Sequence, residues 1–88
     1  MNVILSKSFL RAFRKFLKQH PELEQIAREK IILFSDTPSA PSLGNHKLDG
    51  KLKGKRAFRI DQKYRIVFEL TPDGSALFTD VGDHDEVY

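Results

Sequence analysis

The 88-residue sequence contains no cysteine. This absence excludes a disulfide framework and a thiolate zinc site, so packing alone must stabilise the fold. No stretch of the sequence approaches the ~20 consecutive apolar residues that a membrane-spanning helix needs. The N-terminal residues also lack the long apolar stretch of a secretory signal. We therefore expect a cytoplasmic protein with no membrane contact.

Several catalytic and cofactor-binding motifs are also missing. There is no P-loop, no glycine-rich dinucleotide turn and no helix with a His-x-x-x-His spacing. His20 lies at the junction of two predicted helices, where a structural role is expected. Asp83 and Asp85 flank His84, but this spacing is diagnostic of no metal. We expect no metal and no cofactor, which leaves general acid–base chemistry as the main catalytic option.

Size and charge define the class of protein. A chain of 88 residues that is 40% hydrophobic predicts one domain over residues 1–88, because two independent cores need a longer chain. The net charge of +3 is unevenly distributed: residues 47–65 carry +6 and residues 66–88 carry −6. The basic segment suits a polyanionic partner through phosphate neutralisation and counterion release. It is equally compatible with a solvated face that keeps the protein in solution.

The first half of the sequence predicts a strand followed by a helix hairpin. Residues 3–5 form a short β-branched run that ends at Ser6, a good helix N-cap. Apolar residues then recur every three or four positions over residues 7–19, with basic residues opposite, which is typical of an amphipathic helix. Pro21 suits the first position of a second helix, whose apolar face runs to Phe34.

The second half predicts strands. Residues 36–45 are rich in Pro, Ser, Gly and Asn and indicate a surface connection. Residues 57–61 and 64–70 alternate between apolar and polar side chains, as half-buried strands do. The second of these strands places on its apolar face Tyr64, Ile66, Phe68 and Leu70. A hairpin turn at residues 72–74 leads to a last strand over residues 75–81.

The order of these elements predicts an α+β sandwich. An N-terminal strand and a helix hairpin precede a three-stranded antiparallel meander, and the hairpin covers one face of the sheet. The opposite face is expected to be open to solvent. Strand side chains such as Arg65 can meet a ligand there.

Arg65 and His84 suit chemistry on an RNA phosphodiester. RNA carries its own nucleophile, the 2′-hydroxyl, so a protein need only remove that proton, protonate the departing 5′-oxygen and stabilise charge on the phosphate. Histidine gives or takes a proton near neutral pH, and arginine offers a planar fork of donors that matches a phosphate. Spacing alone leaves the alternatives open, because each residue also suits a solvated or salt-bridged surface role.

The C-terminal half, residues 46–88, carries two distinctive motifs, the strand Tyr-Arg-Ile-Val-Phe and the ending Val-Gly-Asp-His-Asp-Glu-Val-Tyr. With these motifs it resembles the RelE/ParE superfamily of toxins from bacterial and archaeal toxin–antitoxin modules, in particular the RelE/YafQ/YoeB branch. It implies a microbial RNase-like fold. It also implies a metal-independent mRNA interferase that enters the ribosomal A site, cuts the mRNA, inhibits translation and is neutralised in a hetero-oligomer by its antitoxin.

The resemblance also implies roles for individual residues. Arg65 matches the arginine that contacts the scissile phosphate, and His84 matches a general acid. His46 matches a loop histidine of the YafQ branch, where a base is expected, and Tyr88 matches a tyrosine that stacks on a base or orients the phosphate. The basic residues expected to bind RNA backbone, mostly ribosomal RNA, are Lys47, Lys51, Lys53, Lys55, Arg56, Arg59 and Lys63.

Two positions depart from the pattern of YafQ-like proteins. Arg59 stands where those proteins have a second histidine, and Asp80 where they often carry an arginine for the phosphate. The acidic tail repels RNA unless its carboxylates act on His84 or pair with the basic segment. Because ParE relatives of the same architecture poison DNA gyrase and cleave nothing, a gyrase-binding toxin or an inactive antitoxin-binding homologue are alternatives. A general nucleic-acid-binding module is a third.

Overall fold

The structure is a computed structural model that describes residues 1–88 apart from the side chain of Glu86. Its strands and helices, in chain order, are β1 (Val3–Leu5), α1 (Lys7–Gln19), α2 (Glu24–Asp36), β2 (His46–Lys47), β3 (Arg56–Arg59), β4 (Tyr64–Leu70), β5 (Ala76–Asp83) and α3 (His84–Val87). Short 3-10 segments occur at η1 (Pro21–Leu23), η2 (Pro41–Leu43) and η3 (Gly50–Leu52). No helix in the described part of the chain has the length and apolar character needed to cross a membrane.

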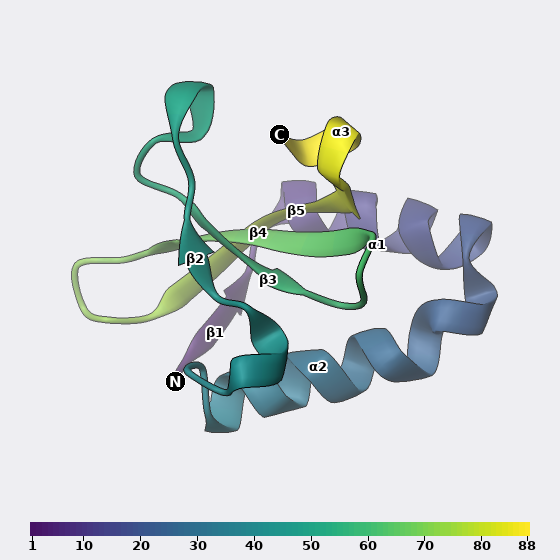
Figure 1. Cartoon of the computed structure of the whole chain (residues 1–88), viewed down its shortest axis with the longest axis horizontal. Helices are drawn as coiled ribbons and strands as arrows, with labels where there is room; N and C mark the ends of the chain where they lie inside the picture. The colour runs from purple at the N-terminus through teal and green to yellow at the C-terminus, as the bar shows by residue number, and fades with distance from the viewer.

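The strands form one sheet in the order β1-β5-β4-β3-β2 (Figure 1). Strands β2 to β5 are antiparallel neighbours, whereas β1 lies parallel to β5, with Val3 opposite Ala76. The predicted α+β class and element order are confirmed. The meander has one strand more than predicted, because the two-residue β2 in the basic segment is too short to show a period. The last strand runs to Asp83, two residues beyond its predicted end, and α3 follows it.

The helix hairpin forms largely as its sequence predicts. Ser6 caps α1, since its Oγ accepts a hydrogen bond from the Phe9 N–H at 3.0 Å. Pro21 follows the C-cap residue of α1, His20, but residues 21–23 form a 3-10 turn, so α2 begins only at Glu24. The hairpin therefore contains a tighter turn than a simple two-helix pattern indicates.

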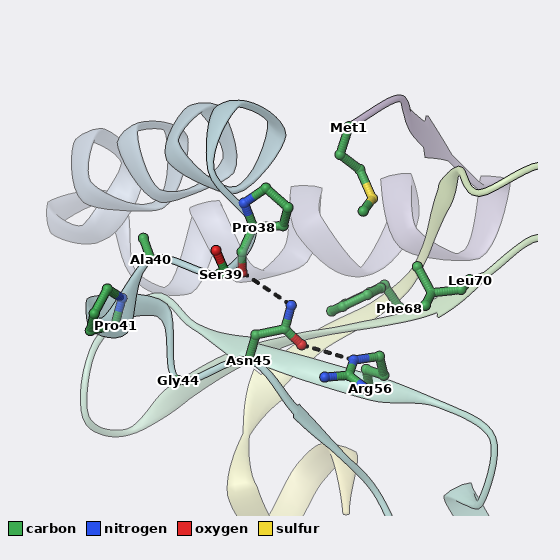
Figure 2. Close-up of a pocket in the computed structure, with 10 residues that line it drawn as sticks. All are labelled: Met1, Pro38, Ser39, Ala40, Pro41, Gly44, Asn45, Arg56, Phe68 and Leu70. Carbon is green, nitrogen blue, oxygen red and sulfur yellow. Dashed lines mark hydrogen bonds between the residues drawn. The ribbon is translucent and has the colours of Figure 1, made fainter.

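The connection over residues 36–45 is less of a surface loop than predicted. Leu43 is fully buried in the main core. The Asn45 side chain donates to the Pro38 carbonyl oxygen at 3.1 Å and accepts from Arg56 Nε at 2.9 Å (Figure 2). These contacts fix the connection against β3, so the segment that leads to His46 has a defined course.

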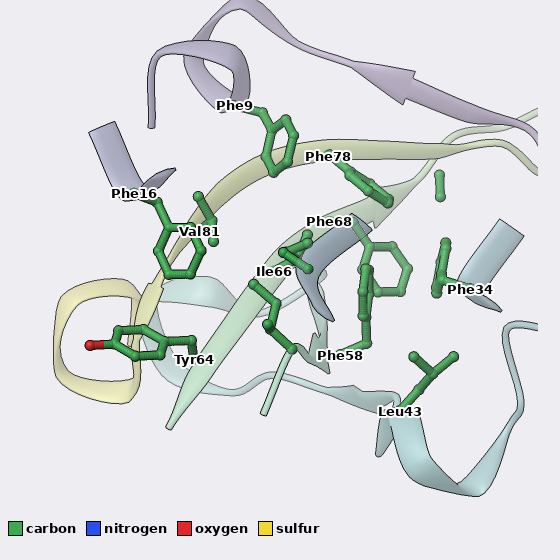
Figure 3. Close-up of a cluster of buried hydrophobic side chains, with 13 residues drawn as sticks. Phe9, Phe16, Phe34, Leu43, Phe58, Tyr64, Ile66, Phe68, Phe78 and Val81 are labelled. Carbon is green, nitrogen blue, oxygen red and sulfur yellow. The ribbon is translucent and has the colours of Figure 1, made fainter. Parts of the chain in front are cut away.

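Six buried phenylalanines form the centre of the core between the hairpin and the sheet (Figure 3). The Phe34 ring of α2 stacks on Phe58 with centroids 4.5 Å apart. Its edge contacts reach Phe68 at 4.8 Å and Phe78 at 5.6 Å. Phe34 thus connects α2 to three strands at once. Full burial of such a side chain contributes about 1.5–3 kcal/mol to folding.

The opposite face of the sheet is not open, contrary to the prediction. A second hydrophobic cluster lies on it, formed by Leu48, Ala57, Val67 and Val87. The β2–β3 connection and α3 lie on the same side of the sheet in Figure 1. The connection supplies Leu48 and the partly buried Leu52, and α3 supplies Val87. One or two apolar residues in a short segment show no period, which is why the sequence did not reveal the cluster.

The ends of β4 and β5 differ from the predicted pattern. Leu70 lies at the hairpin end of β4 and is 52% exposed rather than buried. In β5, both Phe78 and Val81 are buried in the main core, although a regular strand would place them on opposite faces. The register explains this. Val67 pairs with Asp80 while its neighbour Phe68 pairs with Phe78, which leaves an extra residue in β5, a β-bulge.

The aromatic centre gives a stability prediction. We expect Phe34→Leu to lower the free energy of unfolding by about 1–3 kcal/mol, because it removes the ring stack and leaves a gap. Ile32→Ala is the matched control on the same helix, since Ile32 is 67% exposed, and it should change stability by less than about 0.5 kcal/mol. Urea denaturation measures both. Equal effects of the two substitutions would contradict the central role of Phe34.

Candidate active site

Arg65 is fixed by main-chain oxygens at one end of the sheet. It is half-buried in β4, where it pairs with Arg59 of β3 and Gly82 of β5. Its Nη1 donates to the Asp61 carbonyl oxygen at 2.7 Å and to the Tyr64 carbonyl oxygen at 3.2 Å. Two hydrogen bonds from one nitrogen restrict the guanidinium to a single region beside the β3–β4 turn.

The side chain of Asp61 holds this turn in place through hydrogen bonds. The sequence analysis did not identify Asp61 as a residue of the site. Its Oδ1 accepts from the N–H of Lys63 at 2.9 Å and of Tyr64 at 2.7 Å. The carboxylate therefore holds the turn whose carbonyl oxygen binds Arg65. An aspartate between two alternating segments is a common turn residue for this reason, and that signal was available in the sequence.

Tyr88 connects Arg65 to two histidines. The Arg65 side chain hydrogen-bonds the phenol, and the phenol oxygen lies 3.2 Å from His46 Nε2. The ring meets His84 edge-on, with centroids 4.2 Å apart and planes at 66°. The structure thus brings together all four residues that the resemblance implied as catalytic, from β2, β4 and the α3 segment.

The hydrogen bonds of His46 indicate which of its two ring nitrogens carries the proton. Its Nδ1 lies 2.8 Å from the Gly44 carbonyl oxygen, which can only accept, so Nδ1 carries the proton. In the neutral ring Nε2 is then the acceptor of the Tyr88 hydroxyl. His46 pairs in the sheet with Ala57, a residue of the second cluster. The arrangement leaves a basic nitrogen facing the site.

His84 is the most accessible member of the group. Its side chain is 68% exposed, and its Nδ1 lies 3.8 Å from a carboxylate oxygen of Asp85. A shallow depression beside it is lined by Gln62, Lys63, Asp83, His84 and Asp85. Exposure lets this histidine exchange protons with solvent and with a bound substrate.

The environment of Tyr88 acts on its ionisation. Burial raises the pKa of Tyr88 above its usual value of 10.0, while the charge and the hydrogen bond of Arg65 partly oppose that shift. The phenol is therefore neutral near pH 7. It can donate its proton in a hydrogen bond to an anion in the site.

The residues predicted to bind RNA do not all share one surface. Lys47, Lys53 and Lys55 surround a depression at the β2–β3 connection together with Arg56. Arg56, however, is held by Asn45 and lines a cavity between the 36–45 connection and β4 (Figure 2). That cavity contains no histidine or carboxylate side chain, so it lacks acid–base groups.

The remaining basic residues lie in β3, in the β3–β4 turn and in η3. Lys63, in the turn that Asp61 holds, places its ammonium 5.4 Å from the centroid of the Tyr64 ring. Lys51 is exposed in η3, and Arg59 is exposed in β3 opposite Arg65. Two of the seven, Arg59 and Lys63, thus lie beside Arg65, one on the paired strand and one in the adjoining turn.

The other singled-out residues lie elsewhere. His20 Nε2 is 3.1 Å from the Tyr64 hydroxyl, in keeping with the structural role predicted for it. Asp80 borders a small cavity together with Lys15 and His20, on the α1 side of β5. Among the described residues, no three His, Asp or Glu side chains are grouped as metal ligands.

This sandwich, with its arginine, histidines and tyrosine at one end of the sheet, has the fold of the RelE/YafQ/YoeB toxins, and the predicted resemblance is confirmed at that level. YafQ from E. coli matches with a TM-score of 0.80 and 17% identity, over 99% of this chain and 97% of that one. A copper-bound mutant toxin from Helicobacter pylori matches with a TM-score of 0.75 and 26% identity, over 100% and 99%. The YoeB/ParE toxin from Agrobacterium tumefaciens matches with a TM-score of 0.72 and 17% identity, over 96% and 99%. No protein-family model and no curated protein sequence matches the chain.

The Tyr88 contacts predict a titration. In Tyr64→Phe, which leaves one tyrosine in the chain, phenolate absorbance should develop above pH 10. Adding Arg65→Gln should raise the pKa of Tyr88 further, because it removes the charge and the hydrogen bond that favour the phenolate. Since the folded state holds this proton more tightly, its stabilising effect is present at neutral pH and lost only as the pH rises through the folded pKa. An unchanged or lower midpoint in the double variant would refute the contact.

Proposed function

We propose that the protein is the toxin of a type II toxin–antitoxin module and a metal-independent, ribosome-dependent endoribonuclease that cuts mRNA. The observation that carries this proposal is the contact of Arg65, His46 and His84 with one phenol, Tyr88. These groups supply a phosphate ligand, a base and an acid within one site. The toxin role is supported by the structural neighbours, among them E. coli YafQ in the DinJ–YafQ toxin–antitoxin complex.

The geometry supports a transfer within the RNA strand. His46 Nε2 accepts the proton of the 2′-hydroxyl as the 2′-oxygen forms a bond to phosphorus. Arg65 and the neutral Tyr88 hydroxyl donate to the phosphate oxygens, where negative charge develops. The bond from phosphorus to the 5′-oxygen breaks, and protonated His84 gives its proton to that oxygen. The products are a 2′,3′-cyclic phosphate and a 5′-hydroxyl end.

The ribosome is the proposed place of this reaction because of the basic segment. Lys47, Lys51, Lys53 and Lys63 are exposed and border the β2–β3 connection or the β3–β4 turn. Lysines in this position suit the phosphate backbone of ribosomal RNA as point charges. Such contacts position the protein without reading a sequence.

We expect Arg65→Gln and His84→Gln each to relieve the growth arrest caused by the native protein. In a translation reaction with purified ribosomes, cleavage of mRNA should slow by about 10²–10³-fold or more. Primer extension locates the cuts, which should follow the reading frame. Arg11→Gln on the exposed face of α1 is the matched control and should cut at the native rate. Full cleavage by both site variants would defeat the assignment.

A gyrase-binding toxin is the second candidate, favoured by the YoeB/ParE name of one neighbour. It predicts no mRNA cuts and a block of DNA supercoiling by the native protein. A supercoiling assay with purified gyrase separates the two functions. An inactive homologue would give neither effect but would still bind its antitoxin.

An antitoxin is the proposed partner, and a groove between α1 and α2 is its proposed contact. Leu5, Leu10 and Ile32 line this groove and are 47%, 44% and 67% exposed. Arg14 and Arg28 border it. An amphipathic helix with acidic flanks fits a groove of this kind.

Antitoxin binding at this groove can be tested with the protein that the neighbouring reading frame encodes. Leu10→Asp should weaken its binding about tenfold or more, because one exposed apolar anchor is replaced by a charge that repels acidic flanks. Leu70→Asp is the control, since Leu70 is 52% exposed at the far end of β4. Calorimetric titration measures both affinities. Equal affinities would place the antitoxin elsewhere.

A further inference from the structure

A cavity of about 450 Å³ lies where the 36–45 connection faces the hairpin end of β4 (Figure 2). Its volume is within the range of about 300–1,000 Å³ that small-molecule sites occupy in proteins. None of the groups assigned to the reaction lines it, so the cavity is separate from the candidate active site. Its wall is mostly apolar and includes Met1, Pro38, Ala40, Pro41, Phe68 and Leu70.

One cation, Arg56 of β3, lines this apolar cavity. The sequence predicted that Arg56 binds RNA backbone, but the ladder pairs it with Phe68, a residue of the main core. Paired residues in a sheet point to the same face. The half-buried Arg56 side chain therefore leaves the sheet on its core face, opposite to the face that carries Arg65.

The side chain of Asn45 fixes the guanidinium in this position. Its Oδ1 accepts from Arg56 Nε at 2.9 Å, and its Nδ2 donates to the Pro38 carbonyl oxygen at 3.1 Å. This partner is neutral, and among the described residues no carboxylate side chain lines the cavity. The hydrogen bond to Asn45 uses one of the five N–H donors of the guanidinium. The charge and the two Nη groups are thus available to a ligand.

The composition of the wall favours a single negative charge on an apolar body. A carboxylate has two oxygens that match the parallel N–H donors of a guanidinium, and one arginine balances its charge. A strand of RNA would instead need an exposed ring on which a base could stack. Phe68 supplies the aromatic ring of the wall and is only 1% exposed.

We propose that this cavity binds a small carboxylic acid with a hydrocarbon body, and that Arg56 holds its carboxylate. The Nη groups of Arg56 donate to the carboxylate oxygens, and the apolar wall covers the hydrocarbon body. Partial burial of the guanidinium strengthens such a charge-assisted hydrogen bond. The binding does not depend on the proposed function, because it involves none of the groups assigned to the reaction.

The cavity also shares a wall with the loop that orients His46. Gly44 and Asn45 both line it, and the Gly44 carbonyl oxygen lies 2.8 Å from His46 Nδ1. His46 itself is not part of the wall. A ligand in the cavity contacts this loop, so the imidazole resonances of His46 should report its binding indirectly.

The experiment titrates the whole protein with phenylbutanoate and follows amide and imidazole resonances by NMR. Phenylbutanamide has the same body without the charge, and acetate has the charge without the body. Phenylbutanoate should bind at least about tenfold more tightly than either, because each of the others lacks one of the two interactions. The shifted resonances should fall on residues 38–45, His46 and Arg56.

Substitutions separate the charge from the shape of the cavity. Arg56→Gln should weaken phenylbutanoate binding at least about tenfold, because it removes the charged donor. Arg56→Lys keeps the charge without the fork and should fall between native and Arg56→Gln. Ala40→Leu fills part of the cavity and should weaken binding with no change of charge. Arg11→Gln, the matched control, removes an exposed arginine of α1 and should leave the affinity unchanged.

Equal affinities of the native protein for phenylbutanoate and phenylbutanamide would overturn the proposal, even if Arg56→Gln failed to fold. Native affinity in folded Arg56→Gln would overturn it too, as would shifts confined to the apolar groove between α1 and α2, which Arg14 and Arg28 border. If phenylbutanoate does not bind and Arg56→Gln weakens the antitoxin complex, the occupant is a partner chain and the proposal is wrong. No RNA takes part, so the result is independent of the cleavage assay.

Discussion

The alternation of side chains along β4 is the constraint on which both the core and the candidate site depend. Ile66 and Phe68 point into the aromatic core, while Arg65 and Val67 point to the other face. A slip of one residue in the register would exchange these faces and bury a guanidinium among phenylalanines. The packing of Phe34 against Phe58 and Phe68 opposes such a slip. The position of the Arg65 guanidinium is therefore fixed by contacts on the far side of the sheet.

The site itself is assembled from short segments rather than from the regular elements. A turn held by Asp61 supplies the carbonyl oxygen for Arg65, and the loop at Gly44 orients His46. The second hydrophobic cluster, through Val87, holds the segment that carries Tyr88 against the sheet. Main-chain oxygens thus position the charged groups without adding a competing negative charge. This arrangement suits a site that must attract an anion.

The sequence predicted the parts of the fold that repeat a pattern. Apolar residues at three- and four-residue spacing indicated the two helices, α1 with Phe9 and Phe16 and α2 with Phe34. The alternation of apolar and polar side chains indicated β3 and β4. It did not predict β2, α3 or the second cluster, because each of these segments contributes too few residues for a period. The bulge between Phe78 and Val81 likewise leaves no periodic signature.

For the candidate site, resemblance selected Arg65, His46, His84 and Tyr88, and the structure shows them in contact through one phenol. The site residues that sequence analysis did not identify act through their backbone atoms. Gly44 contributes a carbonyl oxygen and an absent Cβ, and neither has a side-chain chemistry to recognise. The cross-strand position of Arg59 also depends on the register of β3 and β4, which the sequence leaves open.

The parallel pairing of β1 with β5 joins the first strand of the chain to the last. Val3 lies opposite Ala76, and the Ala76 N–H donates to the Asn2 carbonyl oxygen at 2.8 Å. Strand β1 has no other partner in the sheet, so it must wait for β5 before it can pair. During synthesis, the sheet cannot be completed until β5 has left the ribosome. Until then β1 stays without a partner in the sheet, and the sheet lacks the strand that joins β1 to β4.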